Sequence, residues 1–364
     1  MQGKKTPLFA SHQKYGGKIV EFGGWLLPVQ YSGIIEEHAA VRTKAGLFDV
    51  SHMGEIRVEG REALAFLQNL VTNDLAGMKN GQIRYSPMCY EDGGTVDDLL
   101  IYRYGETCYL VVVNAANIDK DREWMIKNMA GFEAVLTDKS DETAQLALQG
   151  PLSTAILSKL TGEAVADIAF YHFIDDVAVA GKKTMVSRTG YTGEDGYEIY
   201  CAPEDVTHLW ESIMEAGREE GLLPAGLGCR DTLRFESCLP LYGHELSAGI
   251  SPLAAGLGRF VKLDKASFIG REALVRQKEA GLPLKVMGVE VTGRGIARAG
   301  YPIKADGRVI GTVTTGSPAP TLGKNMALAL VDAAYAEIGR EIAVEVRGKE
   351  IAAVIVAKPF YKRS

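Results

Sequence analysis

The sequence has few cysteines, and they form no pattern that would bind a metal or build a disulfide framework. Five cysteines are scattered over 364 residues without a C-x-x-C pair. An odd, dispersed set is typical of free thiols in a reducing compartment. The six histidines are equally dispersed, without H-x-H or H-x-x-x-H spacing. The sequence therefore predicts no metal site.

Long hydrophobic runs are also missing. No stretch of 18 apolar residues occurs, as a membrane-spanning helix would need. The N-terminal region lacks the apolar core and the small-residue cleavage site of a secretory signal. We therefore expect a cytoplasmic protein with no membrane partner.

An excess of positive charge is absent as well. The chain has 40 basic and 46 acidic residues, a formal charge of −6. Duplex binding rests on clustered Lys and Arg that neutralise phosphates, so this balance argues against nucleic acid as the main partner. Hydrophobic residues make up 46% of the chain, which is enough for a sizeable core.

The common catalytic and nucleotide-binding motifs are missing too. There is no G-x-x-x-x-G-K-[ST] loop and no G-x-S-x-G elbow. The Gly226-Leu227-Gly228 and Gly256-Leu257-Gly258 segments lack the third glycine and the expected strand-turn-helix context of a dinucleotide fingerprint. What remains is a set of polar residues in apolar or glycine-rich surroundings.

Periodicity predicts a mixed α+β fold. The chain is too long for one ordinary core, so two or three domains are expected. In the first part we expect helices at 36–45, 60–70 and 118–129, and a three-stranded meander at 85–90, 95–103 and 108–114. In the second part we expect a strand from residue 145, a helix at 152–160, strands at 171–180, 183–188 and 196–201, and a helix at 203–220.

The C-terminal part of the sequence has a different pattern, which is typical of β structure. Residues 285–361 consist mostly of short strands separated by turns such as Asp306-Gly307 and Arg347-Gly348, which indicates a small barrel or sandwich. We therefore expect three domains: two α+β domains at residues 1–140 and 141–280, and a β domain at residues 281–364.

Two neighbouring aspartates stand in an apolar strand. Alternation puts Asp98 on one face with Leu100 and Tyr102, and Asp97 on the other. Whichever face is buried, one carboxylate points into it, and burial costs free energy unless the carboxylate is hydrogen-bonded. An aspartate satisfied by turn amides is the alternative. Asn114 ends the next strand, as a cap or as a ligand contact.

Two further segments carry polar candidates. Glu198 lies among Tyr197, Ile199 and Tyr200, where its two oxygens would suit a paired N–H donor edge, or where it simply faces solvent. Arg230 follows a glycine-rich turn at the start of an expected helix, where surface contacts at i,i+3 and i,i+4 are the alternative.

The motifs taken in order resemble the glycine-cleavage T-protein family. The segments are DVSHMGE (49–55), TNDL (72–75), MCYEDGGTVDDLLIY (88–102), LVVVNAANIDKD (110–121), SRTGYTGEDGYEIY (187–200), GLGCRDTLRFE (226–236), LYGHEL (241–246) and PAPTLGK (318–324). The resemblance runs from end to end of the chain.

The resemblance implies a fold, a reaction and a partner. It implies a three-domain, cloverleaf-like arrangement around a central channel, with a small C-terminal β-barrel. It implies an aminomethyltransferase of the glycine cleavage system. Such an enzyme moves a one-carbon unit from a lipoylated H-protein to tetrahydrofolate, the co-substrate, and releases ammonia.

The resemblance also implies the site residues. The family's catalytic aspartate falls on Asp98. The positions implied to contact folate are Met53, Tyr85, Tyr102, Val112, Asn114, Tyr191, Glu198 and Arg230.

The chain departs from the family pattern at three positions, His244, Ala254 and Arg259, where the family often has Gln, an acidic residue and Trp. Two other functions stay open: a folate-dependent demethylase of a small methylated substrate, and a non-catalytic folate-binding scaffold.

Overall fold

The computed structural model describes residues 3–363, except the side chains of residues 163 and 164. The chain forms two compact units. The first contains the chain up to Leu67, Leu75–Tyr85 and Leu99–Leu233, and the second contains Gln68–Asp74, Ser86–Asp98 and the chain from Arg234 onward. The three predicted domains stay a prediction. Residues 1, 2 and 364, at the ends of the predicted domains, lie outside the described residues.

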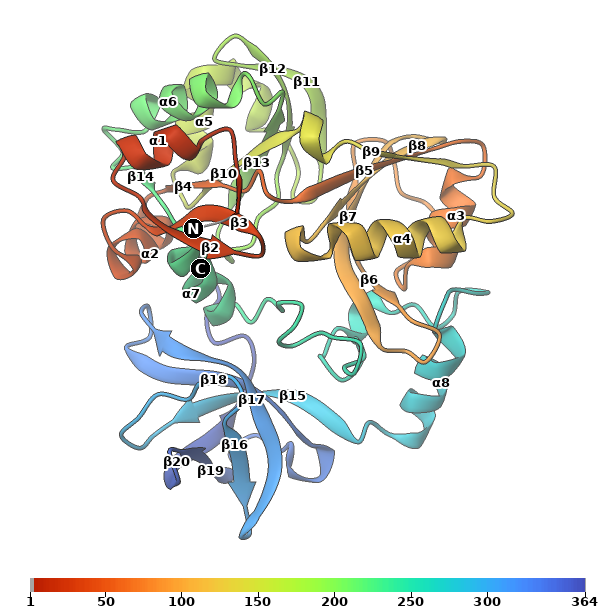
Figure 1. The fold of residues 1–364 in the computed structure, drawn as a ribbon, viewed down its shortest axis with the longest axis vertical. Helices are drawn as coiled ribbons and strands as arrows, with labels where there is room; N and C mark the ends of the chain where they lie inside the picture. The colour runs from red at the N-terminus through yellow and green to blue at the C-terminus, as the bar shows by residue number, and fades with distance from the viewer. Residues whose placement is uncertain (1–2, 364) are drawn as a thin grey trace. The chain divides into compact units, whose positions relative to one another are not determined.

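A six-stranded sheet forms the main core of the first unit. Its strands follow the order β11 (Phe173–Val179), β12 (Lys182–Ser187), β13 (Gly196–Cys201), β10 (Ala144–Gln149), β4 (Gly46–Asp49) and β14 (Leu223–Pro224). Helices α5 (Ser153–Thr161) and α6 (Val206–Ala216) lie side by side and contact this sheet (Figure 1).

Alternation along β10 and β13 separates two faces of that sheet. Leu146, Leu148 and Ile199 belong to the apolar core that includes Trp210 of α6. Because successive side chains of a strand point to opposite faces, Gln145, Glu198 and Tyr200 lie on the other face. This face carries the candidate site.

A five-stranded sheet contains the predicted meander. Its order is β6 (Ile83–Cys89), β7 (Thr95–Gly105), β8 (Cys108–Val113), β5 (Gly54–Glu59) and β9 (Val135–Asp138). The three predicted strands are therefore confirmed as neighbours. Helices α3 (Ala63–Leu70) and α4 (Ile118–Asn128) bury Phe66, Leu67 and Met125.

A small N-terminal sheet completes the first unit. It has the order β1 (Lys4–Lys5), β3 (Trp25–Gln30) and β2 (Lys18–Phe22). Helix α1 (Phe9–Lys14) packs on β2 and β3, and helix α2 (Ile34–Thr43) contacts β3 and β4.

The second unit ends in a closed six-stranded barrel. Around the barrel the strands are β15 (Leu284–Val291), β18 (Lys324–Asp332), β17 (Arg308–Ala319), β16 (Pro302–Ala305), β19 (Glu341–Val346) and β20 (Lys349–Val356), drawn in blue in Figure 1. Small and β-branched side chains such as Val289, Ala327 and Val344 fill its interior. The predicted α+β class and C-terminal β-barrel are confirmed.

Helices differ from the prediction at their ends. The helix expected at 60–70 begins at Ala63, since Gly60 has a φ of 138° that an α-helix does not allow. The helix expected at 203–220 covers Val206–Ala216. Gly217 follows its last residue and packs closely against the Leu222 side chain.

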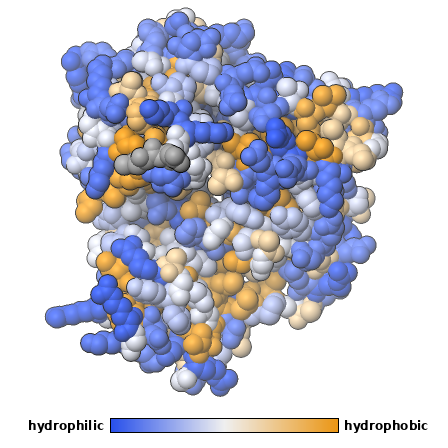
Figure 2. All heavy atoms as spheres, viewed as in Figure 1, coloured by the Kyte–Doolittle hydropathy of each residue, from blue (hydrophilic) through white to orange (hydrophobic). Residues whose placement is uncertain are grey.

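The visible face of the molecule mixes hydrophilic and hydrophobic residues, with hydrophilic ones predominating (Figure 2). Within residues 3–363, no helix combines the length and apolar character needed to cross a membrane.

Candidate active site

Glu198 lies in the middle of β13, between two other strands. Its Cα partners are Ala147 of β10 and Ser187 of β12. Gln145 Nε2 donates a hydrogen bond to Glu198 Oε1 at 3.1 Å, and Thr189 Oγ1 donates to Oε2 at 2.5 Å. Each carboxylate oxygen therefore accepts one hydrogen bond from the protein and has capacity for another.

These donors belong to a closed hydrogen-bonded ring, which we call the Glu198 ring. Ser187 Oγ lies 2.7 Å from Thr189 Oγ1 and 3.4 Å from the Tyr102 hydroxyl. The Tyr102 hydroxyl lies 2.8 Å from that of Tyr200. Gln145 Nε2 closes the ring by donating to the Tyr200 hydroxyl at 3.0 Å. These hydrogen bonds connect the six side chains of the ring, while Gln145 Oε1 is buried without a hydrogen-bond partner.

Burial dominates the electrostatics of the ring. It raises the pKa of Glu198, while the Thr189 hydrogen bond and the positive charge of Arg230 act in the opposite direction. Burial also raises the pKa of Tyr102 and Tyr200 well above the usual tyrosine value. Both tyrosines are therefore neutral hydroxyl groups near pH 7, able to donate hydrogen bonds.

Arg230 and Tyr191 form a second part of the site. The Arg230 guanidinium lies over the Tyr191 ring, 4.5 Å from its centroid, as in a cation–π contact. Beside Arg230 is a cavity of about 10 Å³, lined by Leu27, Pro28, Phe48, Asp49, Ala225, Gly226 and Leu227. This volume holds at most one water molecule.

Two glycines set the position of Arg230. It lies in α7 (Leu227–Glu236), whose start packs against β3. A Cβ on Gly226 would lie 2.6 Å from the Val29 backbone, and one on Gly228 would lie 2.5 Å from the Ile34 side chain. The Gly226 N–H donates to Glu37 Oε2 at 2.8 Å. The sequence predicted no strand before this glycine-rich turn, but the two-residue strand β14 precedes it. The backbone N–H of Gly226, the first amide of the turn, is already hydrogen-bonded to the Glu37 carboxylate.

Met53, Tyr102 and Val112 meet in an apolar cluster. Met53 is half-buried and packs against the cluster that includes Tyr102, Val112 and Met185. Val112 is paired with Leu100 in the sheet, so both side chains are on one face. The structure thus brings three of the predicted positions together beside the Glu198 ring.

The aspartate pair divides as alternation requires. Asp97 is fully buried on the face of β7 that carries Leu99, whereas Asp98 is half-buried on the face of Leu100 and Tyr102. One aspartate of the pair is thus buried, as predicted, and it is Asp97. Asp98 falls in the second unit.

The remaining predicted positions are half-buried. Tyr85 lies within β6, and Asn114 directly follows β8, where its carbonyl accepts a hydrogen bond from the Asn117 N–H at 2.9 Å. These two residues are not members of the Glu198 ring, and their roles in ligand binding stay predictions.

Sequence reasoning missed most of the ring. Ser187, Thr189 and Tyr200 lie within the SRTGYTGEDGYEIY segment but were not singled out. Gln145 opens the strand AQLALQ, in which all six residues are buried. A glutamine in a fully buried strand must find hydrogen-bond partners, and this was the available signal.

The three departures from the family pattern lie in the second unit. His244 Nδ1 is 2.9 Å from the Thr314 carbonyl oxygen, and the Arg259 guanidinium lies over the Phe260 ring at 4.4 Å. Ala254 donates its N–H to Ser251 Oγ at 3.2 Å. Each of the three residues has a local structural contact.

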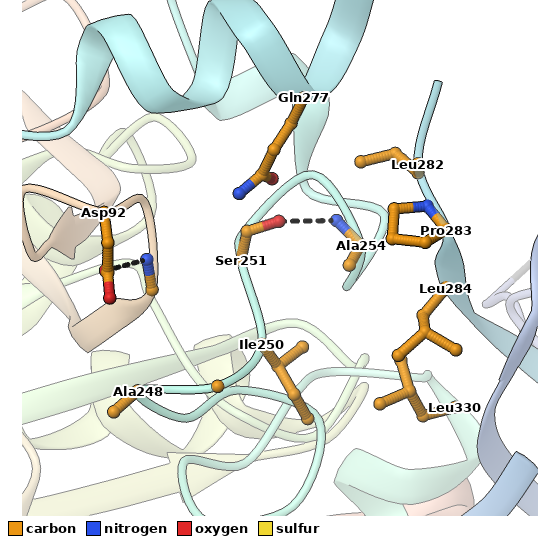
Figure 3. A pocket seen from close by; sticks show the side chains of 12 residues that line it. Asp92, Ala248, Ile250, Ser251, Ala254, Gln277, Leu282, Pro283, Leu284 and Leu330 are labelled. Atoms are coloured by element: carbon orange, nitrogen blue, oxygen red, sulfur yellow. Dashed lines mark hydrogen bonds between the residues drawn. The ribbon is translucent and has the colours of Figure 1, made fainter. Parts of the chain in front are cut away.

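Ala254 also lines a larger cavity of about 290 Å³ within the second unit. Figure 3 shows its apolar side formed by Leu282, Pro283, Leu284 and Leu330. Asp92, which also lines this cavity, already accepts a hydrogen bond from the Gly94 N–H at 2.9 Å. None of the nine predicted site residues lines this cavity.

Within the described part of the chain, no group of three or more His, Cys, Asp or Glu side chains is arranged to hold a metal ion. The fold and the site define an α+β protein with a C-terminal β-barrel and a half-buried glutamate whose carboxylate accepts two hydrogen bonds from the protein.

Comparison with known proteins gives the family. The GCVT N-terminal domain matches residues 8–265, and the glycine cleavage T-protein C-terminal barrel domain matches residues 285–362. The chain belongs to the glycine cleavage T-protein family.

Similar proteins extend over the full length. An aminomethyltransferase of Halalkalibacterium halodurans is 57% identical over 360 residues, covering 99% of this chain and 98% of the relative. One of Geobacillus kaustophilus is 58% identical over 362 residues, covering 99% of each. The crystal structure of the glycine cleavage system aminomethyltransferase T of Bartonella henselae matches with a TM-score of 0.92 at 34% identity, covering 99% of this chain and 98% of that one.

Proposed function

We propose that this aminomethyltransferase takes its one-carbon unit from the aminomethylated lipoyl arm of H-protein and delivers it to tetrahydrofolate. The S–CH2 and C–N bonds of the donor break, and two C–N bonds form on the folate. The products are methylene-tetrahydrofolate, ammonium and the dihydrolipoyl protein, so that atoms and charge balance. Family membership over the whole chain supports the reaction class.

The hydrogen bonding of the Glu198 carboxylate is the main observation that supports folate as the ligand. Its carboxylate is held by Gln145 and Thr189, and each oxygen can accept one more hydrogen bond. The amino group and adjacent ring N–H of a pterin form a pair of parallel donors, which a carboxylate matches in a bidentate manner. The positive charge of Arg230 favours the ionised form that this contact needs.

The other folate contacts follow from the same faces of the sheets. Met53, Tyr102 and Val112 offer an apolar wall beside the Glu198 ring, and Tyr191 offers a ring stacked on Arg230. Tyr85 and Asn114 complete the proposed set. Met53, Tyr85, Asn114 and Tyr191 are half-buried, whereas Tyr102 and Val112 are buried.

We assign the catalytic role to Asp98. Its half-buried carboxylate can accept a hydrogen bond from the attacking folate amine and stabilise the cationic one-carbon unit as ammonia leaves. Enclosure of the reacting groups would protect this unit from hydrolysis. We further propose a cytoplasmic location and lipoylated H-protein as the macromolecular partner.

Ammonia release from aminomethylated H-protein, measured with and without tetrahydrofolate, tests this function. We expect release that is strongly stimulated by tetrahydrofolate. Folate binding without release would instead indicate a scaffold. Turnover of a small methylated amine or thioether in the absence of H-protein would indicate a demethylase. Either result contradicts the proposal.

A further inference from the structure

Arg42 is a buried arginine of α2 that the proposed mechanism does not use. Its side chain is only 5% exposed and forms an ion pair with Glu194, whose side chain is 6% exposed, at an Nη1–Oε1 distance of 2.9 Å. Arg42 Nη1 also donates to the Thr192 carbonyl oxygen at 2.7 Å, and Nη2 donates to that of Leu233 at 3.2 Å. One guanidinium therefore binds two segments that are far apart in the sequence.

The two segments are those that carry Tyr191 and Arg230. Thr192 directly follows Tyr191, and Leu233 comes nearly one helical turn after Arg230 in α7. The Arg230 guanidinium lies over the Tyr191 ring, 4.5 Å from its centroid. Arg42 therefore joins the backbone of the loop that carries the ring to the backbone of the helix that carries the cation.

The loop and the start of the helix also have their own attachments in the first unit. Thr192 Oγ1 donates to Gln149 Oε1 of β10 at 2.9 Å, which holds the loop on the six-stranded sheet. The Gly226 N–H donates to Glu37 Oε2 at 2.8 Å, which holds the first turn of α7 on α2. The hydrogen bonds of Arg42 connect the loop held by the first contact to the helix held by the second.

The shape of the guanidinium group makes this connection possible. It is planar and always charged, and its two Nη atoms donate to separate acceptors. A lysine ammonium is a single point charge, which can occupy the position of one Nη atom but not of both. Arg42→Lys therefore keeps a cation beside the buried Glu194 carboxylate, whose complete loss would be strongly destabilising, and breaks the connection between the two backbones.

We propose that Arg42 is a positioning residue of the folate site: by binding the Thr192 and Leu233 carbonyl oxygens at once, it holds the Tyr191 ring against the Arg230 guanidinium. The inference rests on the proposed function, which assigns the ring and the cation to folate binding, and deepens it. Arg42 acts through these two residues and needs no contact with the ligand. An arginine that only stabilised the unit would leave the contact between ring and cation as it is.

Fluorine nuclear magnetic resonance tests the positioning without a ligand. In protein that contains 3-fluorotyrosine, the Tyr191 resonance is identified by its loss in Tyr191→Phe. Arg230→Met shows where this resonance lies when no guanidinium covers the ring. Arg42→Lys should move the Tyr191 resonance towards that position while the protein remains folded. An unchanged resonance in folded Arg42→Lys would overturn the proposal, whatever the folate affinity is.

Glu194→Gln is a second variant, and it separates the ion pair from the two backbone contacts. It removes the carboxylate charge but leaves the Thr192 and Leu233 carbonyl oxygens bound to Arg42. The Tyr191 resonance should therefore stay at its wild-type position. A shift towards the position seen in Arg230→Met would show that the ion pair holds the ring, and it would overturn the proposal even if Arg42→Lys did not fold.

The dissociation constant of tetrahydrofolate shows whether the positioning matters to the site. Arg42→Lys should raise this constant at least about fivefold in the wild-type background, and less than about twofold in the Arg230→Met background, where the contact is already lost. Independent substitutions multiply their effects on a dissociation constant. Equal fold-changes in the two backgrounds would therefore indicate a general structural role and overturn the proposal.

Arg188→Lys is the matched control, because Arg188 also binds a carboxylate and a backbone carbonyl oxygen. Its Nε donates to Asp195 Oδ1 at 3.0 Å and its Nη1 donates to the Ile168 carbonyl oxygen at 2.9 Å, and both partners lie outside α7. This variant should keep the wild-type dissociation constant within about twofold. A loss of affinity equal to that of Arg42→Lys would overturn the proposal. Absence of tetrahydrofolate binding to the wild type would overturn the proposed function instead.

Discussion

The hydroxyl groups of Tyr102 and Tyr200 lie 2.8 Å apart, and their rings meet edge to face with centroids 5.8 Å apart. Tyr102 comes from β7 of the five-stranded sheet and Tyr200 from β13 of the six-stranded sheet. This contact joins these two sheets through the same hydroxyl groups that complete the Glu198 ring. The ring therefore connects the stability of the unit to the geometry of the site.

Removing the Tyr102 hydroxyl tests that connection. Tyr102→Phe leaves the hydroxyls of Tyr200 and Ser187 each without one partner, so the free energy of unfolding should fall by about 1–2 kcal/mol. Urea denaturation measures this loss. Tyr104→Phe is the control with a smaller expected effect, because the Tyr104 hydroxyl donates to the sulfur of Met185, a weak acceptor. Equal losses in both variants would contradict the role of the ring.

Glu198→Gln should weaken folate binding. The substitution keeps the size of the side chain but replaces an acceptor oxygen by a donor, which opposes the pterin N–H groups. We expect the dissociation constant for tetrahydrofolate to rise on the order of 100-fold, since charged hydrogen bonds contribute about 1.5–3 kcal/mol each. Calorimetric titration measures this change, with exposed Glu204→Gln as control. An unchanged constant would refute the pterin assignment.

Asp98→Asn should lower turnover while folate still binds. Loss of the carboxylate removes assistance worth about 10²–10⁴-fold, so ammonia release should slow by at least roughly 10²-fold. The comparison variant is Asp97→Asn. Because Asp97 is fully buried, its substitution should reduce the free energy of unfolding more than that of Asp98 does. If Asp98→Asn turns over at the wild-type rate, the catalytic assignment is wrong.

Stability should fall at acid pH through Asp49. Burial alone would raise the pKa of Asp49, but hydrogen bonds from His12, Thr6 and Ser51 outweigh it and lower the pKa. Since the folded state then binds this proton less tightly than the unfolded chain, the stabilisation is complete above about pH 4 and is lost as the pH falls through the folded value. Urea unfolding below pH 5 should show a smaller dependence on pH in Asp49→Asn than in the wild type.

Gly226→Ala should disturb both the fold and Arg230. The added Cβ would lie 2.6 Å from the Val29 backbone, which cannot move aside as a flexible side chain can. We expect a loss of about 1–3 kcal/mol in unfolding free energy, together with weaker folate binding. Gly105→Ala, where nothing lies within 4 Å, is the control and should be nearly neutral. Equal stability of the two variants would show that the start of α7 tolerates displacement.

Local periodicity predicted most of the elements. The alternating strands at 85–90, 95–103 and 108–114 became β6, β7 and β8, and the glycine-rich turn before Arg230 did precede a helix. Helix ends were less predictable. The φ of 138° at Gly60 excludes this residue from α3, and α6 ends at Ala216, just before Gly217.

The sequence by itself determined the family, the α+β class, the C-terminal strands and the alternation that separates Asp98 from Asp97, because these depend on the order of residues along the chain. Only the tertiary structure decided which of the two aspartates is buried. It also decided that Glu198 is held by Gln145, 53 positions away, and that Arg42 binds the carbonyl oxygens of Thr192 and Leu233. Burial and hydrogen-bond partnership depend on distances between remote segments, and residue order specifies those distances only through the complete fold.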